Sequence, residues 1–207
     1  MLIRPGRVGR IGSTGRLVAV TPAPTPTSAW NPADKNAAAL LSNSNKTATR
    51  DTGSGNANVR NTVSHMAGKW YAEFLIVGGN VAGSQVGIAN STQVLSIYLG
   101  SSNSAGYGSD GYTGVTNGFV DRSAPFSTAN TVLAVSIDQS VSPQIVHFYK
   151  NGVCITGDPV AGTGGHTIAA DAYFLIASLK EATASFTVRT GAADFTYSPP
   201  SGYTAWG

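Results

Sequence analysis

The most regular pattern of hydrophobic and polar positions lies in the third quarter of the chain. Residues 132–138 alternate in the way of a strand that packs against a core. Residues 144–150 form a second run, rich in β-branched and aromatic side chains. Asn151-Gly152 follows, and this pair favours the positive φ angles of a type I′ turn, so residues 153–155 are expected to start a return strand. Two successive hairpins predict the centre of an antiparallel sheet.

Further strands are expected before this region. Residues 69–77 carry apolar side chains on both faces of the alternation, because Trp70 begins one apolar face and Tyr71 begins the other. This pattern predicts an inner strand that is buried on both sides. Shorter apolar runs predict strands at residues 86–89 and 94–99.

The start of the domain permits more than one assignment. Residues 31–41 are compatible with a short helix that begins near Asp34, or with a strand that begins at Leu40. Residues 49–62 are expected to form a loop and an edge strand, with Arg60 directed outward.

Several of these segments resemble motifs of the SPRY domain family and occur in the order found in that family. They are GKWY at 68–71 followed by Glu73, VGIA at 86–89, VHFYKNGV at 146–153, YFL at 173–175 and the ending FTYSPPSGY at 195–203. The ending is similar to the tail of phage-type members, and the resemblance covers roughly residues 30–207. It implies an all-β, antiparallel, concanavalin A-like sandwich that acts as a binding or structural module and has no catalytic centre.

The composition agrees with a sandwich. Only 11% of the residues are charged, 42% are hydrophobic and 25 are glycine, a balance typical of a folded chain rich in turns. Cys154 has no second cysteine for an intramolecular disulfide, and no Cys/His cluster suggests zinc. No apolar run reaches about 18 residues, so no transmembrane helix is expected. Residues 1–16 lack the apolar segment of a signal peptide, and no cofactor or metal is expected.

The first 20 residues differ from the rest, because they are rich in arginine and glycine and contain no acid. The arginines of this segment are Arg4, Arg7, Arg10 and Arg16. Residues 21–29 form a Pro/Thr-rich spacer of extended, semi-rigid character, and residues 30–207 form the domain. Residues 1–20 are either an unstructured terminus or an arm that docks onto another protein, and the order arm, spacer, domain favours docking. Nucleic acid is not expected as a partner, since four arginines without interleaved aromatic residues bind it weakly.

Residues 100–121 are the best candidate for a recognition surface, because glycine, serine, asparagine and tyrosine dominate them. In adaptable binding loops, aromatic rings provide contact area and small polar groups provide hydrogen bonds. The residues predicted to stack on a sugar or to bond its hydroxyls are Tyr107, Asp110, Tyr112, Asn117 and Phe119. The competing interpretation is that Asp110-Gly111 only forms a turn and that the tyrosines pack inside the sandwich.

Catalysis is not expected. A retaining glycosidase needs two carboxyl groups about 5 Å apart, which acids at alternate positions of one strand would supply. Glu73 has no acidic neighbour at positions 71 or 75, and the 10 acidic residues of the chain show no such pairing elsewhere. The three histidines are scattered, and the GTGGH segment at 162–166 lacks the Lys-Ser/Thr pair of a phosphate-binding loop.

These observations lead to one main functional hypothesis and two alternatives. The chain is expected to be a non-enzymatic surface protein of a phage or phage-like virion, of the head-decoration, spike or tail-fibre type. Residues 1–29 are expected to dock on a capsid or tail protein, while the sandwich, as part of a homo-oligomer, binds a host polysaccharide or receptor. The first alternative is a purely structural subunit of the particle without a ligand. The second is an intracellular SPRY adaptor that binds other proteins.

Overall fold

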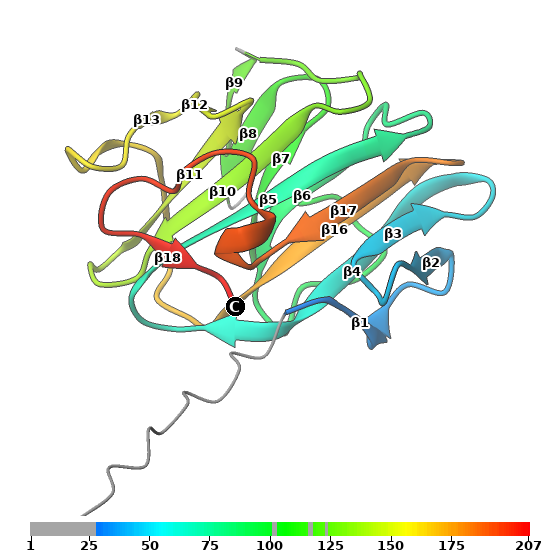
Figure 1. Cartoon of the computed structure of the whole chain (residues 1–207), viewed down its shortest axis with the longest axis horizontal. Helices are drawn as coiled ribbons and strands as arrows, with labels where there is room; N and C mark the ends of the chain where they lie inside the picture. Colours follow the sequence, from blue (N-terminus) through cyan, green and yellow to red (C-terminus); the bar gives the residue numbers. More distant parts are fainter. Residues whose placement is uncertain (1–27, 101–102, 116–117, 123) are drawn as a thin grey trace, which may run out of the picture.

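The computed structural model describes residues 28–100, 103–115, 118–122 and 124–207, and these fold almost entirely into strands (Figure 1). A short 3₁₀ helix, η1 (Ala192–Asp194), precedes the last strand. The strands are, in chain order, β1 (Trp30–Lys35), β2 (Ala39–Ser42), β3 (Thr47–Arg50), β4 (Ser54–His65), β5 (Lys69–Gly78), β6 (Gln85–Ala89), β7 (Ser104–Gly108), β8 (Tyr112–Val115), β9 (Gly118–Arg122), β10 (Val132–Asp138), β11 (Gln144–Lys150), β12 (Val153–Cys154), β13 (Gly157–Asp158), β14 (Thr163–Gly164), β15 (His166–Ile168), β16 (Tyr173–Glu181), β17 (Ser185–Arg189) and β18 (Thr204–Ala205).

The strands form two large sheets that pack face to face. The seven-stranded sheet has the order β1-β4-β16-β6-β7-β8-β9, and all its neighbouring strands are antiparallel. The nine-stranded sheet has the order β12-β11-β10-β5-β17-β3-β2, with β15 added beside β11 and β18 pairing parallel to β5. The predicted all-β, antiparallel sandwich is therefore confirmed.

The core lies between the facing surfaces of the two sheets. Phe74 of β5 and Val135 of β10 point into it from the nine-stranded sheet, and Val86 of β6 points into it from the other sheet. All three are completely buried, and complete burial of such side chains contributes about 1.5–3 kcal/mol each. Trp30, at the start of the edge strand β1, is also completely buried in this core and stacks near Phe74.

The hairpins predicted from the sequence are present. β10 pairs with β11, and β11 pairs with β12 across a turn in which Asn151 has a φ of 49° and Gly152 a φ of 79°. β5 lies between β10 and β17, which confirms it as an inner strand. The strand predicted at residues 86–89 is β6, and the late strand beginning at Tyr173 is β16.

Of the two alternatives for residues 31–41, the helix is wrong and the strand beginning near Leu40 is confirmed as β2, because pairing with β4 and β3 overrides local helix propensity. Ala39 is buried and Leu40 is exposed, so this apolar run has the period of a strand. The expectation for residues 49–62 is also wrong. Residues 49–62 contribute to β3 and to β4, and β4 lies between β1 and β16, so it is not an edge strand. The side chain of Arg60 is only 7% exposed, because a loop covers it.

The expectations for residues 94–121 are also corrected. Residues 94–99 form no strand and run as a loop, and Val94 and Ile97 expose their side chains to solvent. Residues 100–121, expected to be a surface loop, contain β7, β8 and most of β9. The glycines of this segment allow close approach within the sheet. A Cβ atom at Gly106, for example, would lie 2.6 Å from the Cβ atom of Leu99.

In the C-terminal segment, residues 192–203 lie on the outer face of the nine-stranded sheet (Figure 1), whereas β18 pairs with β5 within that sheet and Trp206 is buried in the core. Phe195 and Tyr203 of this segment pack there against Tyr71 of β5 and Tyr149 of β11. Tyr71 makes edge-on contacts with Tyr149 and Phe195, with ring centroids 5.7 and 5.1 Å apart. The resemblance motif at the end of the chain therefore serves as a cover for the sheet.

A buried carboxylate fixes the same segment. Glu73 of β5 is completely buried and accepts hydrogen bonds from the backbone N–H groups of Thr196 and Tyr197, both at 2.8 Å. Arg189 lies 3.4 Å from it and the hydroxyl of Tyr71 lies 3.3 Å from it. Glu73 is thus a structural anchor.

The two ends of the described chain meet at one end of the sandwich. The N–H of Ser28 donates to the carbonyl of Gly207 over 3.3 Å, and the hydroxyl of Thr190 donates to the carbonyl of Ser28 over 2.8 Å. Trp206 is completely buried beside them and donates its indole N–H to the carbonyl of Val63 over 3.0 Å.

Candidate binding groove

A groove lies on the outer face of the seven-stranded sheet, near the end where β4 begins and β16 finishes. Its volume is about 430 Å³, within the usual range for sites that hold small molecules. Its walls come from the five strands β4, β6, β7, β8 and β16, the loops between β5 and β6 and between β6 and β7, and the β7–β8 turn. The side chains that line it include Asn56, Gln85, Tyr98, Asp110, Tyr112 and Lys180.

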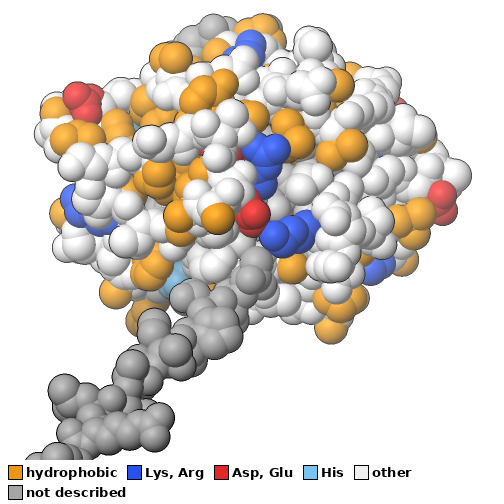
Figure 2. All heavy atoms as spheres, viewed as in Figure 1, with side chains coloured by type: hydrophobic (Ala, Val, Ile, Leu, Met, Phe, Trp, Pro, Cys, Tyr) orange, Lys and Arg blue, Asp and Glu red, His pale blue; other side chains and the backbone are white. Residues whose placement is uncertain are grey.

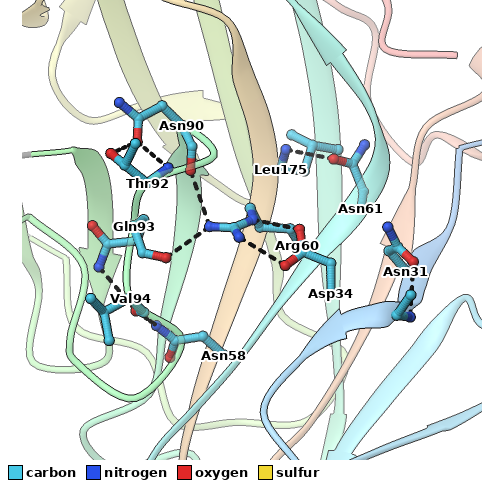
Figure 3. A network of polar contacts seen from close by, with 11 residues as sticks. Asn31, Asp34, Asn58, Arg60, Asn61, Asn90, Thr92, Gln93, Val94 and Leu175 are labelled. Carbon is cyan, nitrogen blue, oxygen red and sulfur yellow. Dashed lines mark hydrogen bonds and ion pairs between the residues drawn. The ribbon is translucent and has the colours of Figure 1, made fainter.

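Side chains of the sheet hold one wall of the groove, the loop at residues 90–100. Arg60 donates to the carbonyls of Asn90 at 3.1 Å and Gln93 at 2.8 Å (Figure 3). Asn58, two residues earlier on the same face of β4, donates to the carbonyls of Val94 at 3.3 Å and Ile97 at 2.7 Å. Polar residues of β4 thus bind the backbone of the loop, which explains why an apolar run such as 94–99 does not pair as a strand.

The orientation of Arg60 is itself fixed by an ion pair. Its Nε and Nη2 atoms lie 2.7 and 2.8 Å from the two carboxylate oxygens of Asp34 in β1 (Figure 3). Such two-point contacts restrict both the position and the plane of the guanidinium group. The edge strand β1, the inner strand β4 and the loop at 90–100 are therefore joined through one side chain.

The far end of the same loop is fastened beside the groove. Gln85 of β6 accepts from the N–H of Leu99 at 2.6 Å and donates to the carbonyl of Leu99 at 3.2 Å. The side chain of Leu99 is completely buried against Ala89 and Ile176. These contacts position the neighbouring Tyr98, whose side chain remains 46% exposed at the groove.

The β7–β8 turn forms the opposite wall. The N–H of Gly111 donates to the carbonyl of Gly108 at 2.9 Å, and Gly111 has a φ of 89°, so the predicted Asp110-Gly111 turn is present. Asp110 is exposed and accepts from the N–H of Tyr112 at 3.3 Å. A Cβ atom at Gly108 would lie 2.7 Å from a carboxylate oxygen of Asp110, so this position has room only for glycine unless Asp110 moves.

The structure separates the residues predicted to form a site. Asp110 and Tyr112 both line the groove. Tyr107 is completely buried, donates its hydroxyl to the carbonyl of Ala124 and contacts Phe126 edge-on, so it belongs to the core and not to the groove. Burial raises the pKa of its hydroxyl.

Other predicted residues are not placed by their side chains. Phe119 lies in β9, of which only the backbone is described, and Asn117 lies outside the described residues. The arginines of the predicted docking arm also lie outside them: Arg4, Arg7, Arg10 and Arg16.

Four of the groove side chains were not predicted from the sequence: Asn56, Gln85, Tyr98 and Lys180. Tyr98 falls in the segment that the sequence predicts to be a strand, so the sequence does not indicate that its side chain is exposed at a groove. The sequence does contain a signal for Lys180. This residue shares one face of β16 with Phe174, Ile176 and Ser178, and it is the charged residue at the end of that row. Asn56 is distant in sequence from the glycine-rich region and meets it only through the sheet.

The histidines and the cysteine show no arrangement for metal binding. His147 is buried beside Cys154, with 3.8 Å between its Nδ1 atom and the Sγ atom, and His166 contacts Thr113 at 2.7 Å. His65 stacks on Trp70 in another part of the structure. Within the described residues, no three His, Cys, Asp or Glu side chains gather as a metal site, and no helix has the length and apolar character to span a membrane.

Charged side chains are sparse on the face that carries the C-terminal segment. Figure 2, drawn from the same side as Figure 1, shows basic and acidic side chains scattered among uncharged ones on this face. Two of its basic residues are paired, since Lys46 lies 2.8 Å from Asp194 and Arg189 lies 3.4 Å from Glu73.

Comparison with known proteins places the fold among SPRY domains. No protein-family model matches the sequence, and no curated protein matches it. The SPRY domain of human HERC1 superposes with a TM-score of 0.59 at 15% identity, over 77% of this chain and 96% of that one. The TRIM65 PSpry domain gives a TM-score of 0.58 at 15% identity, over 79% of this chain and 92% of that one. A human SPRY domain gives a TM-score of 0.57 at 16% identity, over 73% of this chain and 94% of that one. The chain therefore has the SPRY-type β-sandwich fold.

Proposed function

We propose that this chain is a non-enzymatic surface protein of a phage or phage-like virion, and that its groove binds a host polysaccharide or receptor. The position of the groove carries the proposal. Asn56 at the groove and Thr62, which donates to the carbonyl of Ala29 at 2.9 Å, belong to the same strand, β4. The strand rises about 3.3 Å per residue, so roughly 20 Å separate the groove from the start of the domain. A domain anchored through residues 1–29 presents the groove on the side away from its anchor.

The composition of the groove supports a polar ligand such as a sugar. Tyr98 and Tyr112 supply aromatic rings, and Asn56, Asp110 and Lys180 supply hydrogen-bonding groups. Aromatic rings combine a large apolar surface with a polar edge, which suits the alternating apolar and hydroxyl faces of a sugar. A homo-oligomer on a particle would present many such grooves, and multivalent contact strengthens weak individual binding.

The virion part of the proposal rests on the sequence. The ending FTYSPPSGY resembles the tail of phage-type SPRY-like proteins, and residues 1–29 have the composition of an arm followed by a stiff spacer. The partner of residues 1–29 in this proposal is a capsid or tail protein of the same particle. Glu73 is buried under the C-terminal segment and is therefore not exposed to a substrate.

The experiment compares the full-length chain, the Tyr112→Ala variant and a chain lacking residues 1–20. Binding to a panel of bacterial surface polysaccharides is measured by biolayer interferometry, and incorporation into particles is measured by quantitative gel analysis of purified virions. We expect roughly tenfold weaker polysaccharide binding for Tyr112→Ala at unchanged stability, and loss of incorporation without residues 1–20. Full incorporation of the shortened chain would refute the docking arm. Incorporation without any polysaccharide binding would favour the purely structural alternative.

A further inference from the structure

Two polar side chains lie next to each other on one wall of the groove. Lys180 of β16 and Asn56 of β4 are on adjacent strands, since Leu179 pairs with Ala57, and both side chains line the groove. The stem of Lys180 is packed closely, because a Cβ atom at Gly83 would lie 2.9 Å from its Cγ atom. The aliphatic stem of Lys180 is thus packed against the loop that contains Gly83.

Among the described residues, two other lysines are ion-paired, whereas Lys180 is not. Lys46 and Lys69 each lie 2.8 Å from a carboxylate, that of Asp194 and Asp138 respectively. In the described part of the chain, Lys180 has no carboxylate within ion-pair distance. The amide oxygen of Asn56 accepts from the hydroxyl of Ser178 at 3.5 Å, and its NH₂ group is a donor. This wall of the groove therefore offers a positive charge and amide donors.

The opposite wall offers an acceptor and the rings. Asp110 is exposed at the β7–β8 turn, and its carboxylate accepts from the N–H of Tyr112 at 3.3 Å. A carboxylate accepts several hydrogen bonds, so it has acceptor sites left for hydroxyl groups. Tyr98 and Tyr112 complete the lining between the donor wall and the acceptor wall.

We infer that the groove binds an acidic sugar unit of a polysaccharide, with the carboxylate of the sugar held by Lys180 and Asn56 and its hydroxyl groups held by Asp110. This inference rests on the proposed function and specifies its ligand. Charge complementarity selects the anionic group. The carboxylate of Asp110 selects a sugar over an acidic peptide, because neighbouring hydroxyls donate to it whereas a second peptide carboxylate is repelled.

The experiment uses the full-length chain and a panel of oligosaccharides that contain uronic or sialic acid, each paired with its carboxyl-reduced, neutral counterpart. Affinity is measured by isothermal titration calorimetry for the unmodified chain, Lys180→Ala, Lys180→Arg and Asn56→Ala. Lys150→Ala is the matched control, because it removes the same charge from β11 of the other sheet. Thermal unfolding of every variant confirms that it is folded.

We expect at least one acidic oligosaccharide to bind, carboxyl reduction and Lys180→Ala each to weaken binding tenfold or more, and rising salt to weaken it further. Lys180→Arg and Lys150→Ala should remain within threefold of the unmodified chain. Equal binding of acidic and neutral members, no binding of any acidic member, or preference for an acidic peptide such as oligoglutamate would overturn the inference. Polysaccharide binding that survives carboxyl reduction overturns the acidic ligand while leaving the proposed function intact, whereas absence of all polysaccharide binding removes both.

Discussion

The carboxylate of Glu73 joins the nine-stranded sheet to the C-terminal segment that covers it. A buried carboxylate is tolerated only when hydrogen bonds and an opposite charge replace its water, and here two backbone N–H groups and Arg189 do so. Burial, together with the neighbouring Glu73 carboxylate, raises the pKa of the Tyr71 hydroxyl, so that this group remains a donor. One side chain of β5 thus determines the position of residues 196 and 197.

Replacing Glu73 by glutamine tests this role. Glutamine keeps the shape but places an NH₂ group where one of the oxygens accepted a hydrogen bond, and it leaves Arg189 without its partner. We expect the free energy of unfolding to fall by about 2–4 kcal/mol, measured by urea denaturation. Glu181→Gln, at the partly exposed end of β16, is the control and should change it by less than about 0.5 kcal/mol. Similar values for both variants would show that Glu73 is not an anchor.

His65 makes the stability of the domain depend on pH. Its ring stacks on Trp70 with centroids 3.6 Å apart, and its Nε2 atom lies 2.7 Å from the carbonyl of Trp206. Burial lowers the pKa of His65, and the hydrogen bond to Trp206 opposes this effect without reversing it. The unfolded chain, whose histidine has a pKa of about 6.5, therefore binds the proton more readily than the folded chain does.

The consequence is a loss of stability on acidification. The contribution of His65 is present above a pH of about 6.5 and is lost as the pH falls through the lower pKa of the folded state. We expect the free energy of unfolding to decrease from pH 7.5 to pH 5, and the decrease to be smaller in His65→Gln. Burial also lowers the pKa of His147, so part of the dependence should persist in this variant. An unchanged pH profile in His65→Gln would contradict the assignment.

At the scale of elements, the groove depends on a loop that has no strand partner of its own. Side chains of β4 donate to carbonyls of the loop at residues 90–100. Gln85 of β6 bonds both the N–H and the carbonyl of Leu99 at the end of this loop. Polar residues on the outer face of a sheet normally contact water. Here they bond the backbone of the loop, which has no strand ladder to satisfy it. The position of Tyr98 is therefore determined by the contacts of Arg60, Asn58 and Gln85 with the loop.

Arg60→Ala should release this loop. The substitution removes the donors to the carbonyls of Asn90 and Gln93 and leaves Asp34 unpaired, so we expect roughly 2–4 kcal/mol of destabilisation. Hydrogen–deuterium exchange of residues 90–99 should become at least tenfold faster. Asp34→Asn serves as the comparison, since it removes the ion pair but keeps both contacts to the loop. Exchange in Arg60→Ala as slow as in the unmodified chain would mean that the loop does not depend on Arg60.

The strands that the sequence predicts correctly are those whose pattern is set by local alternation. Val132–Asp138 and Gln144–Lys150 follow one another through short turns, and Asn151-Gly152 specifies its own backbone geometry. The sequence wrongly predicts a strand at residues 94–99 because its apolar residues resemble those of a strand, whereas in the fold Asn58 and Gln85 bind its backbone from distant positions. Such contacts arise from the arrangement of the sheet and have no local signal.

The candidate site was predictable only in part, for the same reason. Asp110 was found because Asp-Gly marks a turn, and Tyr112 because it lies beside that turn. Tyr107, one residue before the end of β7, faces the core, and alternation within a glycine-rich segment does not reveal which tyrosine is buried. Lys180 and Asn56 join the groove only when β16 and β4 pair.

At the scale of the whole molecule, the two ends of the seven-stranded sheet differ. One end holds Ser28, Trp206 and Gly207, where the described chain begins and finishes, and the other holds the groove. The inner strand β4 runs between these ends, with His65 near the first and Asn56 near the second. A module with this polarity can be attached and can bind at the same time without either contact blocking the other.

The contact between Ser28 and Gly207 brings the first and last described residues of the domain next to each other. The spatial arrangement of the strands is therefore separable from the order in which they are synthesised. A circular permutant that joins Gly207 to Ser28 through a short linker and opens at the exposed residues 160–162 keeps every strand pairing of the two large sheets. By the same geometry, a fluorescent protein or affinity tag fused after Gly207 emerges at the end of the sheet opposite the groove and leaves the groove uncovered.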